Sequence, residues 1–162
     1  MIFQQAIVSP LGPLIITSRR DLNERNIKGV REAITAIDFV AEPDALAAPS
    51  ALTEQAAKQL EAYFAGQLTQ FDLPLAAAGT KFQQQVWQAL CAVPYGTTVS
   101  YQTIANSIAK PKAVRAVGMA NSRNPIAIVI PCHRVIGANG TLTGYAGGLD
   151  KKEALLRLEG SW

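Results

Sequence analysis

The segment Pro131-Cys132-His133-Arg134-Val135 places one of only two cysteines directly beside the only histidine of the chain. A thiolate is a strong nucleophile, but a thiol with a pKa of about 8.5 is little ionised near neutral pH and needs a base. Neighbouring side chains of a regular strand point to opposite faces, so Cys132 and His133 can cooperate only if the chain turns. Pro131 favours a turn because it cannot continue a central strand. The segment therefore predicts a nucleophilic cysteine.

The main alternative for a cysteine in this setting is a buried, unreactive role, because free cysteine often packs as a small hydrophobe. The apolar run of residues 126–130 predicts a strand that would lead Cys132 into a core. Cys91 lies one turn after Trp87 on a predicted helix, and we expect it to pack. Tetrahedral zinc sites usually need four soft ligands, and this chain offers three, so we expect no metal site.

Composition restricts the class of protein. The 162 residues are 49% hydrophobic, enough for the core of one domain or of two small ones. No apolar run approaches the roughly 20 residues of a membrane span, and the first residues lack the basic region of a signal peptide. Two cysteines provide no disulfide framework. We therefore expect a cytoplasmic protein that is not associated with a membrane.

Charge differs between the two halves of the chain. Residues 1–79 carry six basic and nine acidic side chains, whereas residues 80–162 carry nine basic and three acidic ones. The second half thus has a net charge of +6, which favours contact with a polyanion. A solvated basic face without a partner is the alternative.

The first half predicts a β-rich scaffold that contains one helix. Apolar residues from Leu52 to Phe64 recur at helical spacing, and Gly66 is positioned to end that helix. The other expected elements are strands at residues 3–8, 14–17 and 33–40, a turn at 9–12, a loop at 21–30 and a linker at 67–79.

The second half predicts mainly helices. Thr80 and Gln83 form a capping box at the start of a helix that Pro94 ends. Two short helices, at residues 101–109 and 113–121, have the form of a helix-turn-helix. The small residues of the second helix suit either a groove or packing between helices, and its one long cation, Arg115, favours the groove. The remaining expectations are a turn at residues 137–140, a glycine-rich loop at 141–148, and a helix at 151–158 with an Asp150–Glu153 capping box and Gly160 after its end.

An ordered set of motifs resembles the O6-alkylguanine-DNA alkyltransferases (methylated-DNA–protein-cysteine methyltransferases). The set covers residues 79–160, and residues 1–78 match only loosely. It consists of Gly79-Thr80-Lys81-Phe82-Gln83, Val86-Trp87, Tyr101, Arg115-Ala116-Val117-Gly118, Asn124-Pro125, Ile130-Pro131-Cys132-His133-Arg134-Val135, Gly144-Tyr145-Ala146-Gly147-Gly148 and Leu158-Glu159-Gly160.

The resemblance implies an α+β fold with a ribonuclease H-like domain at residues 1–78 and a mainly helical DNA-binding domain at 79–162. It implies direct repair, in which an O6-alkylated guanine is flipped out of duplex DNA and its alkyl group is transferred irreversibly to Cys132. O4-alkylthymine is a further possible substrate. The implied partner is double-stranded DNA containing O6-alkylguanine, with no cofactor, no membrane and a monomeric protein.

The resemblance also implies roles for particular residues. His133 would take the thiol proton through water, Glu159 would orient the imidazole, and Asn124 would brace the turn. Backbone groups of Cys132 and Val135 would contact the guanine edge, with Tyr101, Tyr145 and Ala146 at the substrate. Arg115 would fill the gap left by the flipped base, in a DNA-binding surface with Ala113, Val114 and Gly118.

Other readings of these residues stay open at this point. Without the resemblance, Glu159 could merely end a surface helix and Tyr101 could be a packing residue. A cysteine hydrolase using Cys132, His133 and Glu159 would turn over repeatedly, whereas an alkyltransferase would stop after one reaction per molecule. A lesion-binding, non-catalytic relative would usually lack the motif cysteine, which is present here.

Overall fold

The computed structural model describes residues 1–21 and 31–162, which form two compact units, Met1–Ala78 and Gly79–Trp162. Apart from Asp21, which ends a strand, the loop predicted at residues 21–30 lies outside the described residues. In this part of the chain, no helix is both long and apolar enough to cross a bilayer.

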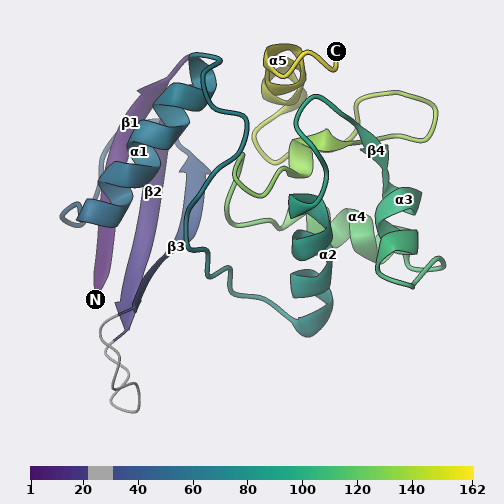
Figure 1. Cartoon of the computed structure of the whole chain (residues 1–162), viewed down its shortest axis with the longest axis horizontal. Coiled ribbons are helices and arrows are strands. Elements are labelled where there is room, and N and C mark those ends of the chain that lie inside the picture. The colour runs from purple at the N-terminus through teal and green to yellow at the C-terminus, as the bar shows by residue number, and fades with distance from the viewer. Residues whose placement is uncertain (22–30) are drawn as a thin grey trace. The chain divides into compact units, whose positions relative to one another are not determined.

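The first unit contains an antiparallel sheet of three strands in the order β1-β2-β3. The strands are β1 (Ile2–Ser9), β2 (Gly12–Asp21) and β3 (Arg31–Phe39). Helix α1 (Ala51–Phe64) lies across one face of the sheet (Figure 1). Residues 14–16 of the central strand are consecutive and all buried, so β2 has buried side chains on both of its faces. The three predicted strands are therefore confirmed, each longer than or offset slightly from its expected range.

Helix α1 follows its sequence pattern closely. Ala56, Leu60 and Tyr63 are fully buried at spacings of four and three residues, which place them on one side of the helix. Ser50 caps the N-terminus in a capping box with Thr53. Gly66 has a φ of 74°, in the left-handed region that favours glycine, and it follows the C-cap as predicted.

A polar cluster around Glu32 joins the start of α1 to the sheet. The Glu32 carboxylate accepts hydrogen bonds from Ser18 of β2 at 2.6 Å, from Arg20 at 3.1 Å and from the N-cap Ser50. Burial alone would raise the pKa of Glu32, but these hydrogen bonds and the Arg20 charge leave the pKa lowered. The carboxylate thus stabilises the contact between helix and sheet as an anion.

The expected linker at residues 67–79 is wrong for part of its length. The Ile34 amide donates to the Pro74 carbonyl at 2.8 Å, and the Ala76 amide donates to the Ile34 carbonyl at 2.8 Å. Leu75 therefore pairs with Ile34 as a single parallel bridge at the edge of the sheet. The surrounding Pro and Ala residues concealed this pairing, because one bridge leaves no periodic pattern.

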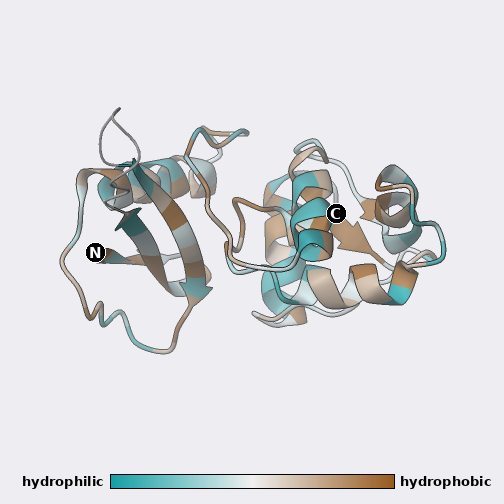
Figure 2. Ribbon diagram, turned by 90° about the horizontal axis from the view of Figure 1, so that it is seen from below, coloured by the Kyte–Doolittle hydropathy of each residue, from teal (hydrophilic) through white to brown (hydrophobic). Residues whose placement is uncertain are grey.

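The second unit contains four α-helices and a pair of two-residue strands. The helices are α2 (Lys81–Cys91), α3 (Tyr101–Ser107), α4 (Val114–Ser122) and α5 (Leu149–Leu158), and the strands are β4 (Val99–Ser100) and β5 (Val135–Ile136). β4 and β5 pair in parallel, and the apolar β5 shows brown in Figure 2. The turn predicted at residues 137–140 closes with a hydrogen bond from the Gly137 amide to the Thr141 carbonyl at 2.9 Å.

Helix α2 anchors this unit. The Thr80–Gln83 capping box is confirmed, and Val86 and Leu90 are fully buried. Trp87 donates from its indole Nε1 to the Ala120 carbonyl of α4 at 2.9 Å, which ties the two helices together. The packing role expected of Cys91 is wrong: it is exposed, because it is the last residue of α2.

The strand predicted at residues 126–130 is also wrong. The segment is a compact series of turns, in which Ile128 has a φ of 72° and the Ile130 amide donates to the Ile126 carbonyl at 3.1 Å. Its three isoleucines are buried. A short apolar run gives the same signal for a buried strand and a buried coil, so the sequence could not separate them.

Two helix boundaries differ from the expected ones. Helix α5 begins at Leu149 after Gly148, so Asp150 lies inside the first turn and the predicted capping box is wrong. An acidic residue there still interacts favourably with the positive end of the helix dipole. The connection between α3 and α4 is residues 108–113, longer than expected, and Ala109 has a φ of 59° within it. The expected Gly160 position is confirmed, with a φ of 78° after the C-cap Glu159.

Candidate active site

The chain turns at the cysteine motif, as the sequence predicts. Cys132–Arg134 form a single turn of 3-10 helix, and Cys132 donates its amide to the Ile130 carbonyl at 2.8 Å. A 3-10 turn advances by about one third of a revolution per residue, so consecutive side chains do not alternate as in a strand. Both His133 and Arg134 can therefore reach the same carboxylate.

That carboxylate is Glu159, the C-cap residue of α5. His133 Nε2 lies 2.7 Å from Glu159 Oε2, and both side chains are buried. Because a carboxylate only accepts hydrogen bonds, Nε2 carries the hydrogen and the second ring nitrogen, Nδ1, is the acceptor. Nδ1 is buried and makes no hydrogen bond among the described residues. A neutral imidazole held in this way presents a free base position.

Arg134 fixes the other side of the carboxylate. Its guanidinium donates to both oxygens of Glu159, from Nε at 2.8 Å and from a terminal nitrogen at 3.1 Å. The remaining terminal nitrogen donates to the Val93 carbonyl at 2.7 Å, and the guanidinium lies 5.7 Å from the centre of the Tyr95 ring. Such a bidentate pair is strong and directional. Sequence reasoning assigned Arg134 no role, but these contacts make it the residue that orients Glu159.

Burial sets the charge states of the cysteine and the histidine. It lowers the pKa of His133, an effect that the Glu159 hydrogen bond and charge oppose. It raises the pKa of the Cys132 thiol, which a hydrogen bond with the Asn124 side chain and the charge of Lys152 oppose in part. The resting site is therefore a neutral thiol beside a neutral imidazole. A thiol becomes a strong nucleophile only when it loses its proton, and a neutral imidazole is in the state that can accept one.

Lys152 is a residue of this site that sequence reasoning missed. It is fully buried on α5, and its Nζ donates to the Val135 and Thr143 carbonyls at 2.6 Å each. Burial lowers the pKa of Lys152 to about 8, and the nearby Cys132 opposes that shift. The available signal was the spacing of α5, in which Lys152, Leu155, Leu156 and Glu159 form one buried stripe.

The side chains of Asn121 and Asn124 hold the turn that carries Cys132. Asn124 donates from Nδ2 to the Ile130 carbonyl at 2.7 Å and accepts from the Ile126 amide at 3.0 Å. Asn121, which the sequence did not single out, donates from Nδ2 to the Cys132 carbonyl at 3.4 Å. With these amides and Lys152 around it, Cys132 is only 6% exposed but is not enclosed by aliphatic side chains alone.

The expected substrate-contacting residues lie on the loop after β5 and at the start of α3. The Tyr101 hydroxyl hydrogen-bonds to the Thr143 hydroxyl at 3.1 Å, and Thr143 in turn binds Lys152 through its carbonyl. Burial and the charges of Cys132 and Glu159 raise the pKa of Tyr145, so its phenol stays protonated. Val135 is buried, and its carbonyl accepts a hydrogen bond from Lys152 Nζ. Ala146 is exposed.

The expected DNA-binding residues occupy different faces of α4. Arg115 is exposed, whereas Ala113 and Val114 are half-buried. Gly118 packs against Tyr101, since a Cβ there would lie 3.8 Å from the ring. The sequence reasoning missed Met119, one turn after Arg115, which is 60% exposed. The outward face of α4 thus combines one long cation with an apolar side chain.

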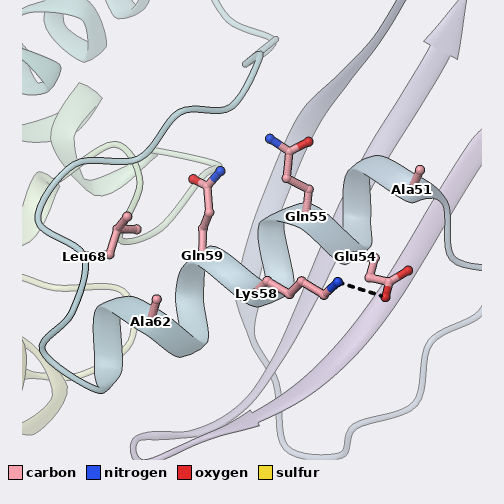
Figure 3. A pocket seen from close by; sticks show the side chains of 7 residues that line it. All are labelled: Ala51, Glu54, Gln55, Lys58, Gln59, Ala62 and Leu68. Atoms are coloured by element: carbon pink, nitrogen blue, oxygen red, sulfur yellow. Dashed lines mark ion pairs between the residues drawn. The ribbon is translucent and has the colours of Figure 1, made fainter.

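Other parts of the molecule offer less chemistry. Among residues 1–21 and 31–162, no group of three or more His, Cys, Asp or Glu side chains is arranged to bind a metal ion. A shallow hollow of about 370 Å³ runs along α1, where Lys58 pairs with Glu54 at 3.6 Å (Figure 3). None of the predicted site residues lines it.

Two family models match the chain. Residues 81–161 match the 6-O-methylguanine DNA methyltransferase DNA-binding domain, and residues 2–77 match the ribonuclease-like domain of the same family. The chain is 51% identical to a methylated-DNA–protein-cysteine methyltransferase of Methanosarcina barkeri over 97% of this chain and 96% of that protein.

Solved structures agree with these matches. The O6-methylguanine methyltransferase of Mycobacterium tuberculosis superposes with a TM-score of 0.82 at 45% identity, covering 99% of this chain and 94% of that one. A structure of the M. tuberculosis protein OGT in complex with DNA superposes with a TM-score of 0.81 at 46% identity, covering 98% and 93% of the two chains.

Proposed function

The chain belongs to the 6-O-methylguanine DNA methyltransferase family, and from this premise we propose that it repairs O6-alkylguanine in duplex DNA by transferring the alkyl group to its own Cys132. The observation that carries the proposal is the buried contact of His133 with Glu159, which leaves Nδ1 as a base on the residue that directly follows the cysteine. A nucleophile, its base and a group that orients the base are the general arrangement for activating a thiol.

The transfer is a displacement at the alkyl carbon. The sulfur of Cys132 attacks that carbon while the bond from carbon to O6 of the base breaks, and the bond's electrons return to the guanine. The thiol proton passes through a water molecule to His133. Guanine leaves as an anion and takes up one proton at its ring nitrogen from solvent, while His133 returns its proton to solvent, so protons balance. A thioether has no acidic hydrogen and no described group is arranged to cleave it. Each molecule therefore reacts once.

The remaining residues of the site position the reactants. Glu159 orients His133, and Asn124 braces the turn through the Ile130 carbonyl. Backbone groups of Cys132 and Val135 bind the edge of the extruded base. Tyr101 assists base rotation and hydrogen-bonds the leaving guanine, with Tyr145 and Ala146 at the lip of the pocket.

DNA binds to the second unit, which carries the positive charge of the chain, through α3 and α4 as a helix-turn-helix. Arg115 enters the duplex and occupies the space of the extruded base, while Ala113, Val114 and Gly118 allow close approach. Extruding a base costs a few kcal/mol and costs less for a weakly paired lesion, which contributes selectivity. The first unit, residues 1–78, is the scaffold domain.

The protein acts as a monomer in the cytoplasm. Both cysteines are free thiols, and Cys132 must stay reduced in order to react, which a cytosolic redox poise ensures. O4-alkylthymine is a secondary substrate of the same site.

The deciding experiment is intact-mass analysis after mixing the protein with a duplex containing O6-methylguanine. We expect one added methylene group per molecule, located on the peptide containing Cys132. Cys132→Ala should show none, and Cys91→Ala should still show one. No adduct, or an adduct that survives Cys132→Ala, would reject the proposal, and continued turnover would point to a hydrolase.

The DNA-binding role is tested by Arg115→Ala, because the exposed guanidinium has no part in the chemistry. We expect transfer from duplex DNA to slow by at least tenfold, since base extrusion loses its support. Transfer from the free base O6-benzylguanine should change by less than twofold. An equal loss with both substrates would contradict the role of Arg115.

A further inference from the structure

Asn121 is buried beside the reactive cysteine with half of its amide unused. This residue of α4 is only 3% exposed, and Nδ2 donates to the Cys132 carbonyl at 3.4 Å. A backbone carbonyl only accepts, so the NH2 end of the amide donates to Cys132 and Oδ1 is the end that is left as an acceptor. Oδ1 is buried and has no hydrogen-bond partner among the described residues.

An unpaired buried acceptor is unfavourable in the free protein. Buried polar groups nearly always have a partner, and leaving one without a partner destabilises the fold. A leucine of similar size would remove this penalty, and Val117 and Ala120 on the same helix are buried apolar residues. The amide is therefore better explained by a donor that arrives during the reaction.

The proposed substrate offers one suitable donor on its reacting edge. Alkylation of O6 removes the hydrogen from the adjacent ring nitrogen of guanine, which becomes an acceptor. The exocyclic 2-amino group is then the only donor on that edge of the base. O4-alkylthymine has no amino group at all. An acceptor next to Cys132 thus distinguishes the two lesions by chemistry and not by size.

The carbonyls next to the cysteine are already engaged. The Cys132 carbonyl accepts from Asn121, and the Val135 carbonyl accepts from the buried ammonium of Lys152 at 2.6 Å. Each carbonyl keeps one lone pair for a further donor, whereas Oδ1 of Asn121 has its full capacity free. An amino group with two hydrogens can bind one of these carbonyls and Oδ1 together.

We propose that Asn121 is a specificity-determining residue, whose Oδ1 accepts a hydrogen bond from the 2-amino group of the extruded O6-alkylguanine. The inference rests on the proposed function and adds the side chain that selects alkylated guanine over alkylated thymine. A site built to hydrogen-bond a substrate group discriminates against analogues that lack it.

The test compares two duplexes of the same sequence, one with O6-methylguanine and one with O6-methylhypoxanthine, which lacks only the 2-amino group. Single-turnover rates are measured for the wild-type protein, Asn121→Leu and Asn121→Ala, with the unfolding temperature of each. We expect either substitution to slow transfer from O6-methylguanine about tenfold, the effect of losing one buried hydrogen bond. Because Asn121 also holds the Cys132 carbonyl, either substitution slows O6-methylhypoxanthine as well, but only through loosening of this turn. The readout is therefore the ratio of the two rates, and the preference for O6-methylguanine should fall several-fold.

Trp87→Phe is the matched control, because it removes the hydrogen bond to Ala120, the residue before Asn121, without touching the amide. It should affect both duplexes equally. If the Asn121 variants slow both duplexes equally, or neither, the amide has only a structural role and the inference is overturned. If wild-type Cys132 takes no methyl group from either duplex, the proposed function itself fails.

Discussion

Glu32 in the first unit, which is half-buried, and Glu159 in the second, which is buried, are two carboxylates that each bind several side chains but have different roles. Glu32 accepts from two serine hydroxyls and from Arg20, whose side chain is 38% exposed, and it joins a helix cap to a sheet. Glu159 accepts from Arg134 and His133, both buried, and one of these partners can change its charge. The comparison teaches that a buried carboxylate becomes chemically useful through a titratable partner beside a nucleophile.

Glu159→Gln should produce the largest effect. The amide keeps the shape of the side chain but loses the charge, so it cannot stabilise the imidazolium that forms when His133 takes the thiol proton. We expect the rate of alkyl transfer per folded molecule to fall by about 10²-fold or more. The buried Arg134 would also lose its counter-charge, lowering the free energy of unfolding by about 3–5 kcal/mol.

Single-turnover kinetics well below the unfolding transition measure the first effect, and denaturant unfolding measures the second. The matched control is Glu153→Gln on the same helix, where the exposed carboxylate pairs with Arg157 at 3.1 Å. Its stability should change by less than about 0.5 kcal/mol, with no change in rate. If Glu159→Gln transferred the alkyl group at the wild-type rate, Glu159 would have only a structural role, like Glu32, and the proposed difference between the two carboxylates would be wrong.

The second effect is on pH dependence. Burial lowers the pKa of His133 below its ordinary value, so the unfolded chain binds a proton at a higher pH than the folded one. The stability from the neutral imidazole is complete above the ordinary histidine pKa, about 6.5, and is lost as pH falls towards the folded pKa. The transfer rate depends on the folded pKa alone, so it should stay constant from pH 8 through pH 6.5 and fall only at lower pH. A decline that begins well above pH 6.5 would contradict this, as stopped-flow rates across the range would reveal.

Glu32→Gln should have the smallest effect, confined to stability. One Glu32 oxygen accepts from both serines, so an amide at this position can preserve part of the cluster. We expect a loss of about 1–2 kcal/mol in urea unfolding and an unchanged transfer rate. Because the pKa of Glu32 is lowered, this stability is present above pH 4.5 and is lost as the pH falls further. A change in transfer rate would show that the first unit participates in the chemistry.

Features that depend on a few neighbouring residues could be predicted from the sequence. The Thr80–Gln83 capping box, the turn at Pro131 and the glycines that end α1 and α5 all follow from local chemistry. The fold class followed in the same way, since strands and helices in the two halves have different periodicity.

Features that depend on tertiary contacts could not be predicted so directly. The apolar residues 126–130 form a coil because the Asn124 side chain satisfies their backbone, which no periodic pattern signals. Lys152 and Asn121 resemble ordinary helix residues until the fold brings each to a carbonyl near Cys132. The sequence indicated the nucleophile and its base, but not the polar groups that surround them.

The position of Cys91 has a practical consequence for handling the protein. A bulky, water-borne maleimide or dye reaches the exposed Cys91 first, whereas Cys132 is 6% exposed. Thiol titration of the folded protein therefore counts mainly Cys91 and does not report how many molecules still have an unreacted Cys132. In Cys91→Ser, Cys132 would be the single remaining thiol. Thiol titration after denaturation would then count the molecules in which Cys132 has not been alkylated.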